Sequence, residues 1–184
     1  MDFTVNPQSV TSVYGLDGVT YFPRNGITGL DARTASFLST VGLPTSELFT
    51  SRMGIEDPYD PDVDAITLGS RFAHYGLQCP LESRSWWSLG YLFTSLLALD
   101  PESGKIYAFP EGAVDYIELH RDIESLVFAL IELRKVEKDH EGDVDPEELA
   151  ARFRENVEAF DPTPFEDENS QWNLSLEELE HGIW

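Results

Sequence analysis

The fold of this chain is decided by residues 89–134, which read LGYLFTSLLALDPESGKIYAFPEGAVDYIELHRDIESLVFALIELR. Two segments rich in Pro, Gly and acidic residues, 100–104 and 110–112, have the composition of tight turns. They separate three apolar ranges, and apolar runs of this length between turns predict strands. The ranges are 89–99, 105–109 and 114–119. We therefore expect three consecutive strands that form an antiparallel meander.

The periodicity changes at Ile123, where apolar residues begin to recur at helical spacing. The stripe consists of Ile123, Leu126, Val127, Leu130 and Ile131. Asp122 stands where an N-cap belongs, and Arg134, Lys135 and Lys138 stand where positive charge stabilises the end of a helix. A meander that leads into a helix across its face forms a two-layer core. The expected fold class is α+β, a mostly antiparallel sheet with helices packed on one side.

The composition is strongly acidic: 34 Asp and Glu against 12 Lys and Arg give a net charge of −22. Residues 136–184 carry 16 acids and 3 bases, so the excess is greatest there. Such a chain repels nucleic acid and anionic membranes and attracts basic partners. The alternative is that acidity only keeps the protein soluble, and the charge by itself does not choose between the two.

The chain also carries signals of compartment and size. Its first residues, MDFTVNPQSV, lack the basic start and apolar run of a signal peptide, and no run of about 18 apolar residues is present. The single cysteine, Cys79, fits a reducing cytoplasm. We expect it to be a buried or half-buried thiol and not a nucleophile, because it precedes Pro80 and no His adjoins it. Residues 1–184 are expected to form one domain, with about 136–184 as an acidic helical extension packed on it.

The segments outside residues 89–134 are predicted to form further helices, strands and loops. Residues 1–30 show no helical period, although 19–22 has the composition of a short edge strand. Asp31 caps a predicted helix over 31–41, and Asp145 caps a second, which begins at Pro146. The remaining predictions are a strand over 65–72, a loop over 74–87, a charged linker over 137–143 and a final short helix that opens with a capping box at Ser175.

No motif of catalysis or cofactor binding occurs, and the four histidines are scattered. We expect His120 to be a polar turn residue. Asp60, Asp62 and Asp64 have the alternate spacing of a calcium loop, but the sixth position is not Gly and the twelfth is Arg71 instead of Glu. No catalytic, cofactor-binding or metal-binding residue is therefore predicted.

Several segments, taken in order, resemble the SUKH superfamily of bacterial immunity proteins, most closely its fourth subfamily. The matching segments are 37–44 with Leu48-Phe49, the strand end at 97–100, the turn and strand at 103–107, the strand-to-helix step at 116–130, and Phe160-Asp161-Pro162 followed by Trp172 and Gly182-Ile183-Trp184. The resemblance covers roughly residues 20–184. The family usually has an Asn-x-Ser-like step before the long helix, where this chain has His120-Arg121-Asp122. Since Asp caps as well as Ser, the expected fold is unchanged.

The resemblance implies a cytoplasmic antidote that binds a cognate toxin domain, often a nuclease or another nucleic-acid-modifying enzyme. It implies that the protein blocks the toxin without chemistry of its own, and that its fold is α+β. The acidic surface suits a basic toxin cleft. Because the family's interfaces vary with the toxin, the resemblance transfers no contact residue to this chain.

The candidate toxin-contact residues come from composition and expected exposure. Residues 55–64, IEDPYDPDVD, form an acidic loop, and Trp86-Trp87 leads into the meander. Adjacent side chains on a strand point to opposite faces, so one Trp is expected in the core and the other at the surface, where an exposed Trp is typical of interfaces. A purely structural role is the alternative. The candidates are Glu56, Asp57, Tyr59, Asp60, Asp62, Asp64 and Trp86.

Two other hypotheses stay open at this point. One is a non-catalytic regulatory or scaffold protein of the SUKH type with a different protein partner. The other is an enzyme that uses carboxylates for general acid-base catalysis, which would require perturbed carboxylates in one concave pocket. The sequence does not indicate the oligomeric state.

Overall fold

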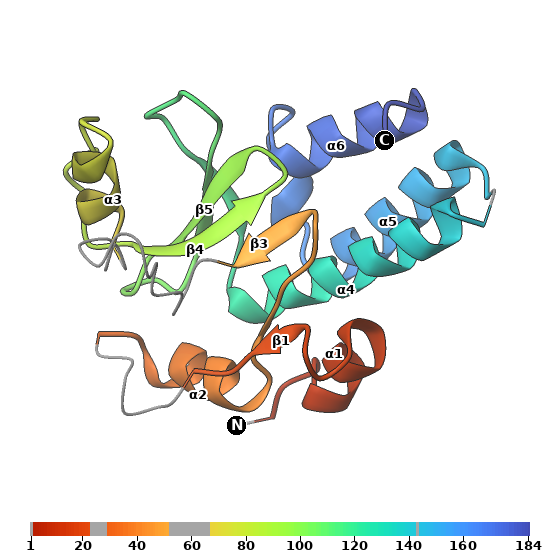
Figure 1. Ribbon diagram of the computed structural model, residues 1–184, viewed down its shortest axis with the longest axis horizontal. Helices are drawn as coiled ribbons and strands as arrows, with labels where there is room; N and C mark the ends of the chain where they lie inside the picture. The colour runs from red at the N-terminus through yellow and green to blue at the C-terminus, as the bar shows by residue number, and fades with distance from the viewer. Residues whose placement is uncertain (1, 23–28, 52–66, 143) are drawn as a thin grey trace.

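The computed structural model describes residues 2–22, 29–51, 67–142 and 144–184 (Figure 1). Its centre is a sheet of five strands in the order β3-β4-β5-β6-β7, in which each strand is antiparallel to its neighbours. The strands are β3 Phe49–Ser51, β4 Trp87–Leu92, β5 Ser95–Leu99, β6 Ile106–Phe109 and β7 Ile117–His120. The order in space equals the order in the chain, which confirms the predicted meander.

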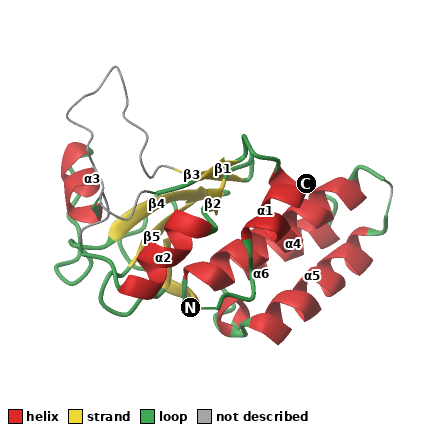
Figure 2. Cartoon of the chain, turned by 90° about the horizontal axis from the view of Figure 1, so that it is seen from below, coloured by secondary structure: helices red, strands yellow, loops and turns green. Residues whose placement is uncertain are grey.

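The described residues also form helices and a second, two-stranded sheet. The expected α+β class is confirmed. The helices are α1 Pro7–Tyr14, α2 Ala32–Thr40, α3 Leu68–His74, α4 Ile123–His140, α5 Pro146–Phe160 and α6 Gln171–Glu180, with a 3-10 turn η2 at Thr163–Phe165. The small sheet pairs β1 Val19–Thr20 with β2 Leu43–Pro44. Figure 2 shows α4 and α5 side by side, and α3 at the opposite end of the molecule.

Helix α4 is the central element of the fold. Asp122 caps it as predicted, and its side chain accepts a hydrogen bond from the backbone N–H of Ser125. The helix packs against α1, α2 and α5, and its apolar residues share one core with the sheet. That core also includes Leu149 and Phe153 of α5 and Trp172 of α6, so the last two helices are held by the same burial. The division of the chain at about residue 136 stays a prediction.

The opposite face of the sheet carries a second, smaller core, so helix α3 departs from the expected placement of the helices on one side. Leu68 and Phe72 of α3 pack there against Trp86 and against Leu96 and Phe109 of the sheet. This is why the central strand β5 is buried along its whole length: Leu97 and Leu99 belong to the first core, and Leu96 and Ala98 to the second.

Local predictions failed where tertiary contacts decide the structure. The range 89–99 is not one strand but the hairpin β4–β5, because Phe93 takes a φ of 50° and reverses the chain. The range 65–72 is not a strand: Thr67 caps helix α3, and residues 65 and 66 lie outside the described part. Residues 7–14 form a helix that the sequence pattern did not predict. Asn6 caps its start, and its apolar pattern is weak because Val10 is the one residue of this helix that is buried.

Two helix boundaries also differ from the prediction. Helix α4 continues to His140 through most of the predicted linker. Helix α6 begins at Gln171, capped by Ser170, and Ser175 lies buried inside it instead of at its start. The cap of α5 at Asp145 and that of α2 at Asp31 are confirmed. None of the helices in the described ranges is long and apolar enough to cross a membrane.

Gly90 is predicted to be indispensable to the β3–β4 pairing. Its φ is 147°, and a Cβ there would lie 2.2 Å from the carbonyl oxygen of Thr50 on the neighbouring strand. The variant Gly90→Ala should lower the free energy of unfolding by about 2–3 kcal/mol, as measured by urea denaturation. Gly112→Ala is the matched control, because Gly112 also has a positive φ of 75° but no atom within 4 Å. The control should lose only about 1 kcal/mol, and equal losses would contradict the steric explanation.

Candidate functional site

The acidic-loop residues predicted as toxin contacts lie outside the described part of the chain. These are Glu56, Asp57, Tyr59, Asp60, Asp62 and Asp64, and the calcium-like spacing falls in the same segment. Its described neighbours are placed: Ser51 pairs with Gly90 on β4, and Thr67 forms a bridge with Trp87. Both described neighbours therefore pair with strand β4. The contact role of these residues stays a prediction.

Trp86 lies mainly in the core. It is only 6% exposed and stacks on Tyr107 with ring centroids 4.3 Å apart, while Trp87 is half-buried against the other core. One Trp of the pair is a core residue, as expected, but it is Trp86, so the surface exposure expected of this candidate is wrong. Burial of Trp86 favours its structural role, and direct contact with a toxin stays a prediction.

Trp86 belongs to a surface that sequence reasoning missed, which we name the aromatic face. It is the part of the sheet surface opposite α4 formed by Trp86, Tyr91, Tyr107, Phe109 and Tyr116. The rings pack on one another. The ring centroid of Tyr116 lies 4.9 Å from that of Trp86 and 5.3 Å from those of Tyr107 and Phe109. The tyrosines are only partly buried. Trp86 and Phe109 are buried, so the three tyrosines supply the accessible part of the face. Partly exposed aromatic rings are typical of protein-protein interaction sites.

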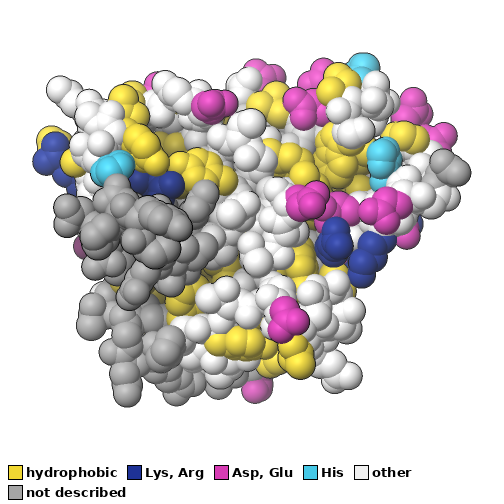
Figure 3. Space-filling model, in the orientation of Figure 1, with side chains coloured by type: hydrophobic (Ala, Val, Ile, Leu, Met, Phe, Trp, Pro, Cys, Tyr) yellow, Lys and Arg dark blue, Asp and Glu magenta, His cyan; other side chains and the backbone are white. Residues whose placement is uncertain are grey.

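A groove of about 390 Å³ opens at one end of the aromatic face, between α3 and the turn after β6. The sheet residues Tyr91 and Phe109 line it, and Tyr75 and Leu77 stand on its α3 side, 62% and 55% exposed. Figure 3 shows hydrophobic side chains gathered beside α3, at the upper left of the view. The lining is mostly apolar, so the groove suits an apolar side chain better than a polar ligand.

An acidic hollow of about 600 Å³ opens at the other end of the aromatic face, beside Tyr116. Its walls are the start of the edge strand β7 and the segment 166–169. Glu118 in the hollow is paired with Lys105 at 2.8 Å, and this contact raises the pKa of Lys105. Glu166, Asp167 and Glu168 form no ion pair with any described residue. The hollow therefore presents uncompensated negative charge.

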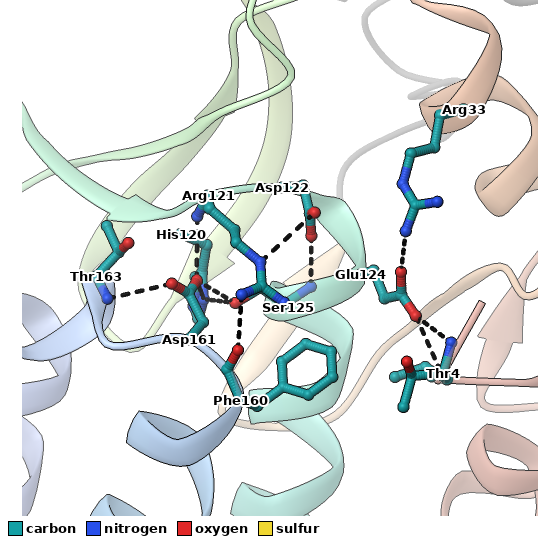
Figure 4. A network of polar contacts seen from close by, with 11 residues as sticks. Thr4, Arg33, His120, Arg121, Asp122, Glu124, Ser125, Phe160, Asp161 and Thr163 are labelled. Carbon is teal, nitrogen blue, oxygen red and sulfur yellow. Dashed lines mark hydrogen bonds and ion pairs between the residues drawn. The ribbon is translucent and has the colours of Figure 1, made fainter. Parts of the chain in front are cut away.

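A buried polar network, the His120 latch, joins four separate elements, and Figure 4 shows three of its members, His120, Ser125 and Asp161. It consists of His120, Ser125, Asp161 and Trp172, all at most 1% exposed. The indole N–H of Trp172 donates to His120 Nε2 at 2.9 Å. Because indole is only a donor, Nε2 must be unprotonated, and the proton lies on Nδ1, 2.9 Å from Ser125 Oγ. Ser125 in turn donates to Asp161.

The latch contains Ser, His and Asp but is not arranged for nucleophilic catalysis. The serine hydroxyl donates to the aspartate and not to the histidine, so His120 is in no position to take its proton. All three side chains are also closed to substrate by burial. His120 is therefore a core residue, and its predicted role in a polar turn is wrong. The sequence offered no signal, because Asp161 and Trp172 lie far along the chain from His120 and Ser125.

Burial also sets the charge states within the latch. Burial lowers the pKa of His120, although Asp161 opposes this. Burial alone would raise the pKa of Asp161, but the nearby ring of His120 and hydrogen bonds from Ser125 and the backbone N–H of Arg121 hold it below its usual range. Above about pH 6.5 the latch thus combines a neutral imidazole with an ionised carboxylate.

The latch predicts a stability loss on mild acidification. Below about pH 6.5 His120 becomes protonated in the unfolded chain but stays neutral in the folded chain. The free energy of unfolding therefore decreases as the pH decreases, by at most about 1.4 kcal/mol per pH unit for one site. Urea denaturation between pH 7.5 and 5 should show a steeper fall for wild type than for His120→Gln. His181→Gln is the control, because His181 is exposed, and it should keep the wild-type slope. An unchanged slope in His120→Gln would refute this assignment.

Comparison with known proteins identifies the family to which this chain belongs. The model of the SUKH-4 immunity protein family matches residues 5–178, nearly the whole chain. No curated protein matches, and no solved structure matches. The match spans the small sheet, the meander, α4, α5 and nearly all of α6. This chain therefore belongs to the SUKH-4 immunity protein family.

Proposed function

We propose that this protein binds and neutralises a cognate polymorphic toxin domain by tight protein-protein binding, without chemistry of its own. The family match over residues 5–178 carries the proposal. The aromatic face supports it, because partly exposed aromatic rings beside an apolar groove are what a protein partner can bury. The Ser-His-Asp group of the latch offers no rival, since it is sealed in the core.

We further infer that the toxin is basic, as a nuclease or another nucleic-acid-modifying enzyme would be. The net charge of −22 and the uncompensated carboxylates of the acidic hollow support this inference. A positively charged cleft that binds phosphates would meet a surface of opposite sign. Such complementarity accelerates association by about 10–10³-fold at low salt, which suits an antidote that must act quickly. We place the protein in the cytoplasm, where nucleic acids are the targets to be protected.

The first prediction concerns protection of cells. Basic toxin domains from the source genome, expressed one at a time in a bacterial host, should kill unless this protein is co-expressed. One of them should regain full colony counts and co-purify with the protein in a one-to-one complex. A folded protein that neutralises none of these toxins and instead binds a different cellular protein would refute the proposal and favour the scaffold hypothesis.

The second prediction concerns the acidic loop. Replacing Glu56, Asp57, Asp60, Asp62 and Asp64 by their amides should slow association with the identified toxin about tenfold at low salt. Surface plasmon resonance at several salt concentrations measures the effect, which should shrink as salt is added.

The matched control removes five exposed carboxylates of α5 and α6. It carries Gln at Glu155, Glu158, Glu177, Glu178 and Glu180, and therefore has the same net charge as the loop variant. A clearly smaller effect in the control is expected. Equal effects in both variants would show that only net charge matters and that the loop is not a contact.

A further inference from the structure

We propose that the toxin anchors itself by inserting an apolar side chain, flanked by Lys or Arg, into the groove between α3 and the turn after β6. This inference rests on the proposed function and names the surface that carries it. The basic neighbours of the anchor would face the carboxylates along the aromatic face. The groove thus supplies the buried contact, and the acidic rim supplies orientation.

The first observation is the unpartnered apolar surface. Tyr75 and Leu77 stand 62% and 55% exposed beside the groove, although both follow a helix that is packed on the sheet. Covering apolar surface stabilises a complex by about 25 cal/mol per Å², so a partner gains from filling this groove. Exposed aromatic and aliphatic side chains around a concavity are typical of the pockets that receive interface anchors.

The second observation is that contacts within the protein support the floor of the groove. Arg71 donates to the hydroxyl of Tyr91 at 3.0 Å, and its guanidinium lies 5.1 Å from the centre of that ring. Phe72 packs edge-on against Phe109 at 5.8 Å, with Trp86 on the other side of Phe109. A preformed pocket loses little side-chain entropy when it is filled, so more of the contact energy appears as affinity.

The third observation is the sign of the surrounding charge. Glu111 stands on the groove itself, and Phe109 in its floor contacts Tyr116, which lines the acidic hollow with Glu166 and Glu168. The groove and the hollow therefore lie at the two ends of the same aromatic face. Among the described residues that line the groove, Arg71 is the only cation and Glu111 the only carboxylate, so the excess negative charge comes from the hollow. Two copies of this chain, each with a net charge of −22, would repel each other. Charge complementarity therefore favours a basic partner.

The test removes the two exposed side chains beside the groove. The variant Tyr75→Ala with Leu77→Ala changes residues that are mostly in water, so the fold should persist. The matched control, Leu16→Ala with Tyr21→Ala, removes the same two side-chain types at positions 77% and 43% exposed, outside the lining of the groove. Circular dichroism and urea denaturation check that both variants are folded.

The probe is the peptide acetyl-Lys-Trp-Lys-amide, titrated into ¹⁵N-labelled protein, with acetyl-Lys-Ala-Lys-amide for comparison. The Trp peptide should shift amide signals of Tyr75, Tyr91 and Gly112, and its affinity should fall at least fivefold in the groove variant but not in the control. Equal affinity in wild type and groove variant would overturn the proposal. Equal shifts from both peptides, spread over all acidic segments, would overturn it as well.

The toxin identified by co-expression provides a second readout. The groove variant should lose at least tenfold in toxin affinity, while the control keeps wild-type affinity. Undiminished affinity in the groove variant would reject the groove and leave the immunity function intact. Failure of wild type to neutralise any toxin would reject the function, and the peptide titration would then decide the groove alone. Sedimentation that shows a wild-type dimer lost in the groove variant would assign the groove to a second copy and overturn the proposal.

Discussion

The structure depends on the burial of helix α4 on nearly all its sides. Between Ile123 and Leu133 every residue except Phe128 is buried, and Phe128 is half-buried under the stacked ring of Phe160. A helix surrounded in this way leaves its polar side chains no access to water, so each must find a partner within the protein. This requirement decides where the neighbouring segments lie.

Three polar side chains of α4 fix three different parts of the chain. Glu124 accepts hydrogen bonds from the backbone of Thr4 and Val5 and pairs with Arg33, which secures the N-terminus and α2. Ser125 belongs to the His120 latch and so connects β7, α5 and α6. Glu132 binds Lys135 of its own helix and Asn156 of α5. Replacing any one of these groups by an apolar residue would leave its partners unsatisfied.

The two faces of the sheet are therefore unequal. Helices cover the face toward α4, and the polar contacts of α4 hold them there. The opposite face is covered only in part, by α3 and the residues after it. Stability comes from the closed face, which leaves the partly open aromatic face available for a partner without a large cost to the fold. A binding protein needs this division, because the surface that a partner will bury must stay partly exposed while the protein is free.

The sequence by itself determined the meander, the long helix after Asp122 and the capped helices at Asp31 and Asp145, because turn composition, helical periodicity and caps are local signals. The acidity that favours a basic partner is also a property of composition. Only the tertiary structure decided that Leu68–His74 is helical, that His120 and Trp86 are buried, and that Asp161 meets Ser125. Those features depend on which distant segments exclude water together, and no local pattern encodes that. The aromatic face and its groove belong to the same class, since their residues come from three strands, helix α3 and the segments next to them, which only folding brings together.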